Sequence, residues 1–503
     1  MIRYFLVIII SLVTFSPNAC GQELYHEMYR PQVHFSPKAG WMNDPNGMVF
    51  FKGKYHLFYQ YYPDSTIWGP MHWGHATSND LVHWKEQPIA LYPDSLGYIF
   101  SGSAVVDSNN TSGFGKDGKV PLVAIFTHHD PVDEKSGSIT FQNQSIAYSL
   151  DEGKTWTKYA GNPVLKNPGI RDFRDPKVSW NEQAKKWIMT LATLDHITFY
   201  SSPNLKDWTK ESEFGKEVGA HGGVWECPDL FPLNYNGEKV WILIVNLNPG
   251  GPNGGSATQY FIGQFDGKTF TPYQTDTRWI DYGPDEYAGI TWSNTGNRKI
   301  FIGWMSNWQY ANIVPTVNWR SACTVPRELA IGKMGDKYMA TSLPVKELSS
   351  LEEKPVVLEN IDATNYNLSE KAGKLAGPVK INLSANKLET FSITLSNKQG
   401  EKLVIGYNKT KNNYYIDRAN SGKIDFEKGF GSIHYAPRFS NETNIDMTLI
   451  IDDASVELFA DKGLTVMTEI FFPTAPYDKI ILDSQEKLTV QQLSYMKLKS
   501  MWK

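Results

Sequence analysis

A short apolar run that begins with lysine recurs five times in the first two thirds of the chain. The runs start 65, 67, 53 and 60 residues apart, at Lys54, Lys119, Lys186, Lys239 and Lys299. Each follows residues typical of a tight turn, and a turn followed by an apolar run predicts a β-hairpin. Strand-rich repeats of this length are typical of the four-stranded blades of a β-propeller. We therefore predict an all-β chain in which residues 30–342 form a five-bladed propeller.

Other architectures fit this region less well. A solenoid would show shorter and more regular repeats. No segment has the sustained amphipathic period and the caps of a helix, which argues against an α/β fold. A β-sandwich is the remaining alternative for the repeat region.

The composition and the pattern of apolar residues change after Pro344. Tryptophan is absent from there until Trp502, and short alternating runs such as 391–395 and 455–459 take over. This pattern predicts a two-sheet antiparallel β-sandwich over residues 356–503. Residues 345–360 contain the connector, with room for one short helix. Because the second domain has few aromatic residues, we expect it to stabilise the protein rather than bind glycan.

The first 20 residues are expected to direct export. Arg3 precedes the apolar run 4–15, and small residues follow up to Cys20, as in a secretory signal. The run is too short to cross a membrane as a stable helix. Cys20 stands where bacterial lipoproteins carry their acylated cysteine, so we expect lipidation there and a lipoprotein at the cell surface or in the periplasm. Plain secretion is the alternative, and membrane contact is expected only through the anchor.

Charge and composition narrow the function further. The chain has 49 basic and 53 acidic residues, a net charge of −4, so it lacks the basic surplus of a general nucleic-acid binder. It also has 16 Trp, 26 Tyr and 25 Phe, whose flat faces suit a sugar ring. The cysteines beyond the signal, Cys227 and Cys323, are expected to be buried free thiols.

Three repeats carry an acid beside a proline ahead of their lysine. Asp44, Asp175 and Glu226 lie 10, 11 and 13 residues before it. The innermost strands of a propeller surround one axis, so acids at matched positions should converge at one end of the channel. Glycoside hydrolysis needs two carboxyl groups beside the scissile bond, and a third can bind ring hydroxyls. Arg174 could donate to hydroxyls or hold a carboxylate. Candidate ring-contacting walls are Trp41, Trp68, Trp73, Trp225 and Trp292.

Several motifs together resemble one known family. Residues 34–47 (HFSPKAGWMNDPNG) look like the signature of glycoside hydrolase family 32, which contains levanases, inulinases and invertases. The segments 100–103, 173–176 and 225–229 agree with the family in order, as do 74–84 and 325–329. The resemblance covers nearly the whole mature chain, and bacterial levanases are the nearest members. It implies a five-bladed propeller followed by a β-sandwich.

The resemblance also implies residue roles. Asp44 would be the nucleophile, Glu226 the general acid and base, and Asp175 the stabiliser of the transition state, with net retention through a fructosyl-enzyme intermediate. No metal and no organic cofactor is implied, and the cluster 128–130 is expected to be structural or exposed. The residues matching the family's fructose pocket are Asn43, Gln60, Trp68, Phe100, Ser101, Arg174 and Trp292.

Substrate preference is open at this stage. The chain departs from the family pattern at Gly289, Ile290 and the segment 319–323. These departures bear on which linkage the enzyme cleaves and on whether it attacks at chain ends or within the chain. We expect a fructan as substrate, with levan (β-2,6-linked) first and endo action suited to a surface enzyme. The alternatives are an exo-acting inulinase or invertase type, a sialidase-like propeller hydrolase suggested by the segment 149–156, and a non-catalytic glycan-binding protein.

Overall fold

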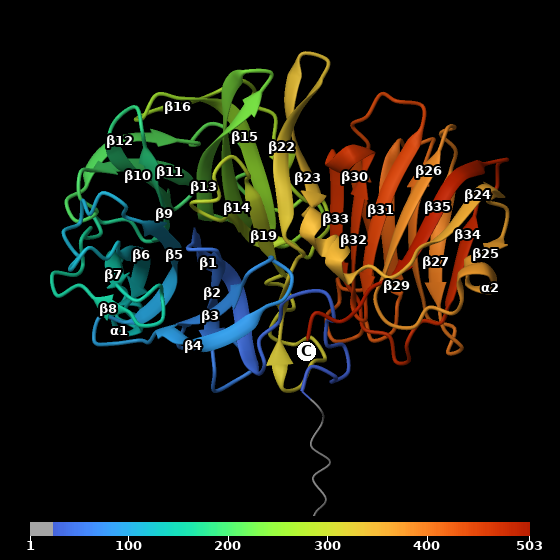
Figure 1. The fold of residues 1–503 in the computed structure, drawn as a ribbon, viewed down its shortest axis with the longest axis horizontal. Helices are drawn as coiled ribbons and strands as arrows, with labels where there is room; N and C mark the ends of the chain where they lie inside the picture. The colour runs from blue at the N-terminus through green and yellow to red at the C-terminus, as the bar shows by residue number, and fades with distance from the viewer. Residues whose placement is uncertain (1–23, 503) are drawn as a thin grey trace, which may run out of the picture.

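The computed structural model describes residues 24–502, and strands make up most of it (Figure 1). Two bodies lie side by side. The blue-to-yellow part holds five separate sheets around a centre, and the orange-to-red part holds two stacked sheets. The predicted class, a five-bladed β-propeller followed by a β-sandwich, is confirmed. Cys20 and the signal segment lie outside the described residues.

Each blade is an antiparallel sheet that runs outward from the channel in chain order. Blade one contains β1 (Gly40–Phe51), β2 (Lys54–Tyr62), β3 (His72–Ser78) and β4 (Lys85–Leu91). Blade two contains β5 (Tyr98–Val106), β6 (Leu122–His129), β7 (Gln142–Ser149) and β8 (Thr157–Lys158), with α1 (Pro131–Lys135) after β6. Blade three contains β9 (Phe173–Asn181), β10 (Lys186–Thr193), β11 (His196–Ser202) and β12 (Thr209–Phe214).

The last two blades carry extra short strands. Blade four contains β13 (Val224–Tyr235), β14 (Glu238–Asn248), β15 (Ala257–Phe265), β16 (Phe270–Pro272) and β17 (Arg278–Trp279). Blade five contains β18 (Tyr287–Thr291), β19 (Ile300–Met305), β21 (Ala322–Cys323), β22 (Arg327–Met334) and β23 (Lys337–Pro344). Between β19 and β21, β20 (Trp319–Arg320) pairs with β1 and so closes the ring. The five lysine-led runs correspond to the second strands: β2, β6, β10, β14 and β19.

The sandwich follows a short connector. The helix η1 (Lys346–Leu351) occupies the connector, where room for one short helix was predicted. One sheet orders β24 (Val356–Asp362), β35 (Thr489–Lys497), β26 (Val379–Ala385), β31 (Ile445–Asp452), β32 (Ser455–Ala460) and β33 (Thr465–Ile470). The other orders β25 (Tyr366–Asn367), β34 (Lys479–Asp483), β27 (Phe391–Ser396), β28 (Lys402–Asn408), β29 (Asn413–Asn420) and β30 (Ile433–Pro437). Two short helices complete it, α2 (Leu368–Ala372) and η2 (Asp461–Gly463).

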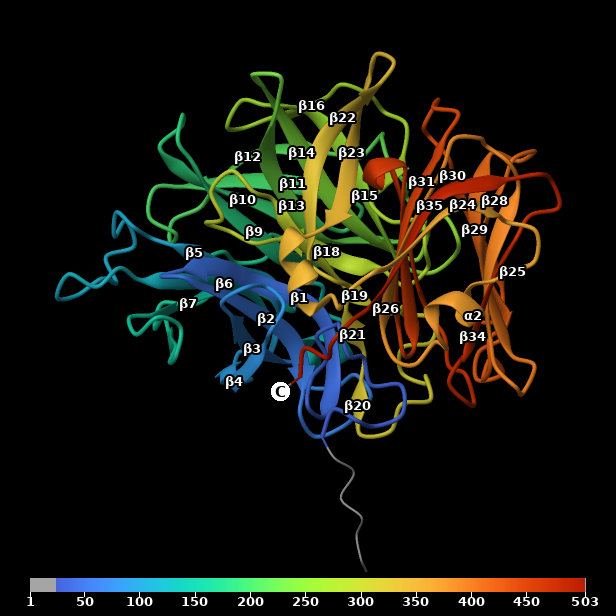
Figure 2. The same cartoon turned by 45° about the vertical axis from the view of Figure 1, so that its right-hand side comes forward.

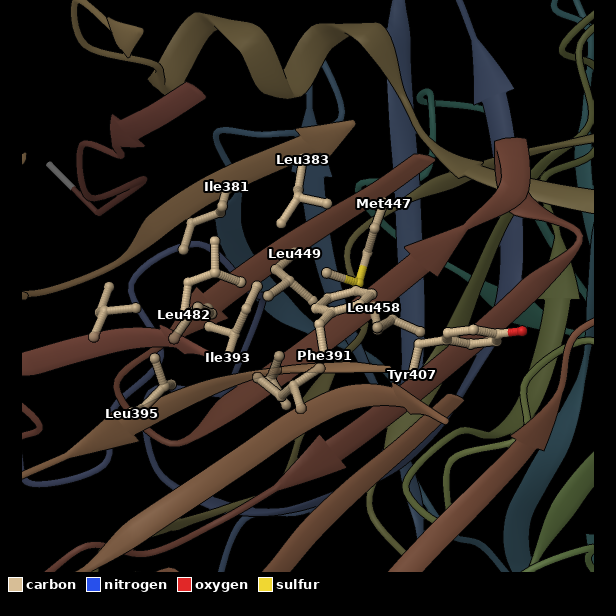
Figure 3. Packing of buried hydrophobic residues seen from close by; sticks show 14 of the residues in the cluster. Ile381, Leu383, Phe391, Ile393, Leu395, Tyr407, Met447, Leu449, Leu458 and Leu482 are labelled. Atoms are coloured by element: carbon tan, nitrogen blue, oxygen red, sulfur yellow. The ribbon is translucent and has the colours of Figure 1, made fainter. Parts of the chain in front are cut away.

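The core of the sandwich lies between its two sheets. Strict alternation in β26 and β27 buries every second side chain, as expected for sheets with one buried face. Figure 3 shows Ile381 and Leu449 from one sheet facing Ile393 and Leu482 from the other. Truncation of such a residue to alanine typically costs about 2–5 kcal/mol.

The sandwich shares buried contacts with the propeller. The turn η2, between β32 and β33, packs against β23, and β33 contacts β19, so the sandwich lies beside blade five (Figures 1 and 2). Ile450, Phe459 and Val466 belong to the same apolar cluster as the core of blades one and five. Between the two domains lies a buried ionic network. His34 contacts Asp452 and Glu457 at 2.8 Å each, and Arg327 pairs with both Glu457 and Asp281. The two domains therefore form one structural unit.

One backbone feature is common to all five innermost strands. Each of β1, β5, β9, β13 and β18 has an extra residue relative to its partner strand near the end where it enters the blade, and β1 has a second one within Gly47-Met48. Such a β-bulge re-aims side chains locally and is frequent beside active sites. The extra residues fall within Asn43-Asp44, Phe100-Ser101, Asp175-Pro176, Cys227-Pro228 and Ala288-Gly289.

Candidate active site

A cleft of about 360 Å³ opens at the end of the channel where the five bulges lie. The three predicted acids line it together with Arg174. The offsets from the lysines had suggested that the acids share one register position, but they do not. Asp44 is the second residue of its bulge, Asp175 is the first, and Glu226 directly precedes the bulge of β13. The bulges compensate for these offsets, so that all three side chains reach one cleft.

Asp44 is held by two neighbours. The Asn43 amide donates to its Oδ1 at 2.9 Å, and the Ser101 hydroxyl donates to its Oδ2 at 2.7 Å. Asn43 is itself fixed by the indole N–H of Trp41, which donates to its Oδ1 at 2.7 Å. These bonds fix the orientation of the carboxylate, and both bonds to it come from uncharged donors.

Asp175 is the most enclosed of the three carboxylates, with 5% of it exposed. Its backbone adopts a φ of 63°, a strained conformation for a non-glycine residue that is often found at functional sites. Its Oδ2 accepts from the backbone N–H of Cys227 at 3.0 Å. Burial, with Glu226 and Asp44 nearby, outweighs the opposing effect of Arg174 and raises the pKa of Asp175 to about 7.

Cys227 lies between the two aspartates. Its Sγ is 3.6 Å from Oδ2 of Asp44 and 3.6 Å from Oδ2 of Asp175. Burial and the surrounding carboxylates hold the pKa of the thiol well above its usual range, so it remains a neutral weak donor. Cys227 and Cys323 are both buried and free, as predicted.

Glu226 is held from two sides. Arg174 donates from Nε at 3.1 Å and from Nη2 at 3.0 Å to Oε1 of Glu226, while the Tyr287 hydroxyl contacts Oε2. Arg174 is in turn anchored by Asp172 at 2.6 Å. Burial opposes the charge on Arg174, but Glu226, Asp175 and Asp172 overcome it and raise the pKa of the guanidinium. Glu226 keeps 20% of its side chain exposed, so it is open to a substrate and to water.

The predicted pocket residues divide into a floor and a wall. Asn43, Gln60 and Ser101 line the cleft and are almost fully buried. Trp68 and Phe100 form an aromatic wall, their rings 6.1 Å apart at 80°. Trp68 is 38% exposed, enough to offer a face to a sugar ring.

The structure does not bring Trp292 into this cleft. Its indole is 2% exposed and donates to the backbone oxygen of His56, because it follows β18 and so lies further along the channel. Its prediction as a pocket residue is therefore wrong. Trp41, Trp73 and Trp225 are also fully buried, so among the five proposed walls only Trp68 lines the cleft.

Sequence reasoning missed several residues in the cleft or directly beside it. Tyr287 begins the innermost strand of blade five, so alignment of all five repeats would have pointed to it. His129 was expected to be structural or exposed, but it lines the cleft and stacks on Phe100 with ring centres 4.2 Å apart. The remaining lining residues carry no motif or come from loops; they are Glu134, Phe141, Gln142, Asp172, Val224, Asn248 and Trp308.

No cluster of three or more His, Cys, Asp and Glu side chains within residues 24–502 is arranged to hold a metal ion. In the same part of the chain, no helix has both the length and the apolar character to cross a membrane. The cleft contains two carboxylates in different environments, one fixed by neutral donors and one open to solvent, with a third beside them. This arrangement suits displacement at an acetal carbon, in which one carboxylate attacks and another transfers a proton.

The propeller and its carboxylate-lined cleft are those of a glycoside hydrolase. The chain belongs to glycosyl hydrolases family 32, whose N-terminal domain matches residues 34–342 and whose C-terminal domain matches residues 347–497. It is 44% identical to a levanase of Bacillus subtilis, over 97% of this chain and 73% of the relative. It is 43% identical to the extracellular exo-inulinase inuE of Aspergillus niger, over 90% of each chain.

A solved structure has the same fold. The crystal structure of exo-inulinase from Aspergillus awamori superposes with a TM-score of 0.88 at 39% sequence identity, covering 95% of this chain and all of the other. The similarity extends through both domains, so the propeller and the sandwich belong to one shared architecture.

Proposed function

We propose that this protein is a retaining β-fructosidase that hydrolyses the β-fructosyl linkages of fructans. The observation that carries the proposal is the gathering of Asp44, Asp175 and Glu226 in one cleft by bulges on three separate strands. The levanase and exo-inulinases among its relatives support a fructan as the substrate.

The proposed reaction has two steps. Asp44 attacks the anomeric carbon of a fructosyl unit, the bond to the leaving oxygen breaks, and Glu226 gives that oxygen its proton. This leaves fructose bound to Asp44 as an ester. Glu226, now a carboxylate, removes a proton from a water molecule, which attacks the same carbon and releases Asp44. Asp175 accepts hydrogen bonds from ring hydroxyls and stabilises the positive charge that develops in both transition states.

Enclosure of the cleft favours attack at chain ends over the endo action expected from the sequence. A volume of about 360 Å³ is at the lower end of ligand pockets, which span about 300–1,000 Å³. Asn43, Gln60 and Asp175 at its base are almost fully buried, so the cleft is closed at its base, which suits entry of a chain end better than passage of a polymer. We therefore propose that a terminal fructosyl unit enters the cleft and the rest of the chain leaves past Trp68.

Levan is the proposed first substrate, on the strength of the levanase relative at 44% identity. Exo-inulinases at 43% identity make inulin the necessary comparison. The decisive test is chromatography of early products from levan, inulin and sucrose. Fructose alone at early times supports exo action; fructo-oligosaccharides at early times contradict it; and no release from any of the three sinks the proposed function.

Export with a lipid anchor at Cys20 is proposed on the sequence of residues 1–20. Extracellular exo-inulinases among the relatives are consistent with export. The test is detergent phase partitioning of the full chain beside Cys20→Ala. The parent should enter the detergent phase and the variant the aqueous phase, whereas aqueous partitioning of both would refute the anchor.

A further inference from the structure

A second hollow lies at the opposite end of the propeller channel. Its volume is about 690 Å³, compared with about 360 Å³ for the catalytic cleft. It is lined by the far ends of the innermost strands, including Trp180 on β9 and the residues after β18. Trp180 lies five residues beyond Asp175, or roughly 16 Å along an extended strand. The two openings therefore face opposite sides of the propeller.

A layer of polar contacts separates the two openings. Lys177 on β9 pairs with Asp229 on β13 at 3.1 Å, and Asp229 accepts from the backbone N–H and hydroxyl of Thr291 at 2.7 Å each. Blade two joins through Ser103, whose hydroxyl donates to the backbone oxygen of Pro176 at 2.9 Å. These bonds tie the innermost strands together and form the floor of the second hollow, so it is built independently of the catalytic cleft.

The walls of this hollow are aromatic. Trp180 is half-buried and packs edge-on against Trp187, with ring centres 5.2 Å apart. Trp241 on the neighbouring blade also lines the hollow, with the Lys239 ammonium 4.7 Å from its ring centre. Indole faces next to polar groups suit the alternating C–H and O–H surfaces of a sugar.

One donor in the hollow has no partner within the protein. Within residues 24–502, the ammonium of Lys299 makes no hydrogen bond and no ion pair, although the side chain is half-buried and lines the hollow. Of the other charged groups that line the hollow, Lys177 pairs with Asp229 and Glu182 with Lys185, while the exposed Lys239 lies over the ring of Trp241. A cation that has no partner within the protein and lines an open hollow is free to donate to the oxygen atoms of a ligand.

We propose that this hollow is a second saccharide-binding site, which holds a segment of neutral fructan chain while the catalytic cleft works on a chain end. The hydroxyl oxygens of the chain accept from Lys299, and its C–H faces pack on Trp180. The choice of fructan rests on the proposed function. Binding here raises the local concentration of polymer at the enzyme, and short substrates gain nothing from it.

The test is a calorimetric titration of β-2,6-linked fructose oligosaccharides into the Asp44→Asn protein, which cannot turn them over. Two sites per chain are expected. Adding Trp180→Ala or Lys299→Gln should weaken one of them by about tenfold or more and leave the other unchanged. Lys186→Gln, an exposed lysine outside the hollow, is the matched control. The proposal is overturned if the Asp44→Asn protein has a single site, or if it has two sites whose affinities neither substitution changes.

Two further measurements separate the alternatives. In the otherwise unsubstituted enzyme, Lys299→Gln should raise KM for levan polymer several-fold and leave kcat/KM for sucrose unchanged. Inorganic phosphate should not displace the oligosaccharide from the second site. Displacement by phosphate would make this an anion site and refute the saccharide. Failure of the proposed function would show separately, as no fructose release from any fructan by the parent enzyme.

Discussion

Asp175 in the catalytic cleft and Glu457 between the two domains are both buried carboxylates, but their charges are satisfied to different degrees. Between the domains, Glu457 accepts from His34 at 2.8 Å, from the Val325 backbone at 2.7 Å and from Arg327 at 3.0 Å. Burial raises the pKa of Glu457, but Arg327 and His34 outweigh it and lower the pKa overall. In the cleft, Asp175 receives one backbone N–H and lies 4.0 Å from Nε of Arg174.

The difference separates a structural role from a catalytic one. A buried charge whose oxygens all have donors contributes to a unique arrangement of the two domains, and removing one partner leaves an uncompensated charge. A buried charge with spare acceptor capacity is costly in the empty protein but ready for substrate hydroxyls. The substitutions below test whether the two groups of charges separate in this way.

The largest expected effect is from Asp44→Asn. The amide has nearly the same shape but cannot form the fructosyl ester, so kcat on fructan should fall by about 10⁴-fold or more. Stability should change little, because Asn43 and Ser101 can still hold the side chain. Fructose release and thermal unfolding measure the two effects. Asp336→Asn, at an exposed turn between β22 and β23, should match the parent in both, and a comparable loss there would discredit the comparison.

Glu226→Ala should lower kcat by about 10²–10⁴-fold, the usual contribution of general acid and base catalysis. A substrate whose leaving group needs no proton makes this test sharper. With fructosyl fluoride, the first step should lose much less rate in this variant than with levan. Equal losses on both substrates would mean that Glu226 is not the acid. Because the substitution also leaves Arg174 without its partner in the cleft, thermal unfolding should be measured alongside.

The sequence predicted most of the fold and the chemically active part of the site. The lysine-led runs located the second strand of every blade, and the acid–proline pairs located three innermost strands. It did not reveal the β-bulges, because a bulge depends on pairing with a neighbouring strand and leaves no fixed motif. Trp292 was misplaced because it follows β18, and its distance from the start of that strand decides which end of the channel it reaches. His129 and Trp308 carry no motif, and only the folding of their blades brings them to the cleft.

Disrupting the network between the domains should affect stability and leave chemistry alone. His34→Gln removes a buried group that contacts Asp452 and Glu457, and loss of such a partner costs about 3–5 kcal/mol. The kcat of the folded variant should equal that of the parent. His83→Gln, whose partner Asp80 is 41% exposed, is the matched control and should cost less than about 1 kcal/mol. Denaturant unfolding followed by assay checks both; a loss of kcat in folded His34→Gln would argue against the division of roles.

This network should also respond to alkaline pH. Burial disfavours the charged form of His34, but hydrogen bonds to Asp452 and Glu457 prevail and raise its pKa to about 9. A histidine whose pKa rises on folding stabilises the protein fully below about pH 6.5, and this stabilisation is lost as pH rises through about 9. The melting temperature of the parent should therefore fall more between pH 7 and pH 10 than that of His34→Gln. Parallel curves would show that His34 is not a buried cation.

The smallest expected effect is a gain in stability from Asp175→Asn. Burial raises the pKa of Asp175 from 3.8 to about 7, so ionising this group costs more in the folded protein than in the unfolded chain. Its contribution is most favourable below about pH 4 and is lost as pH rises through about 7. The amide is neutral and can still accept from the Cys227 backbone N–H. Its melting temperature should therefore exceed that of the parent at pH 8 and approach it at pH 5, while fructose release falls. A lower melting temperature at both pH values would place Asp175 with the structural charges, since its carboxylate would then stabilise the fold as Glu457 does.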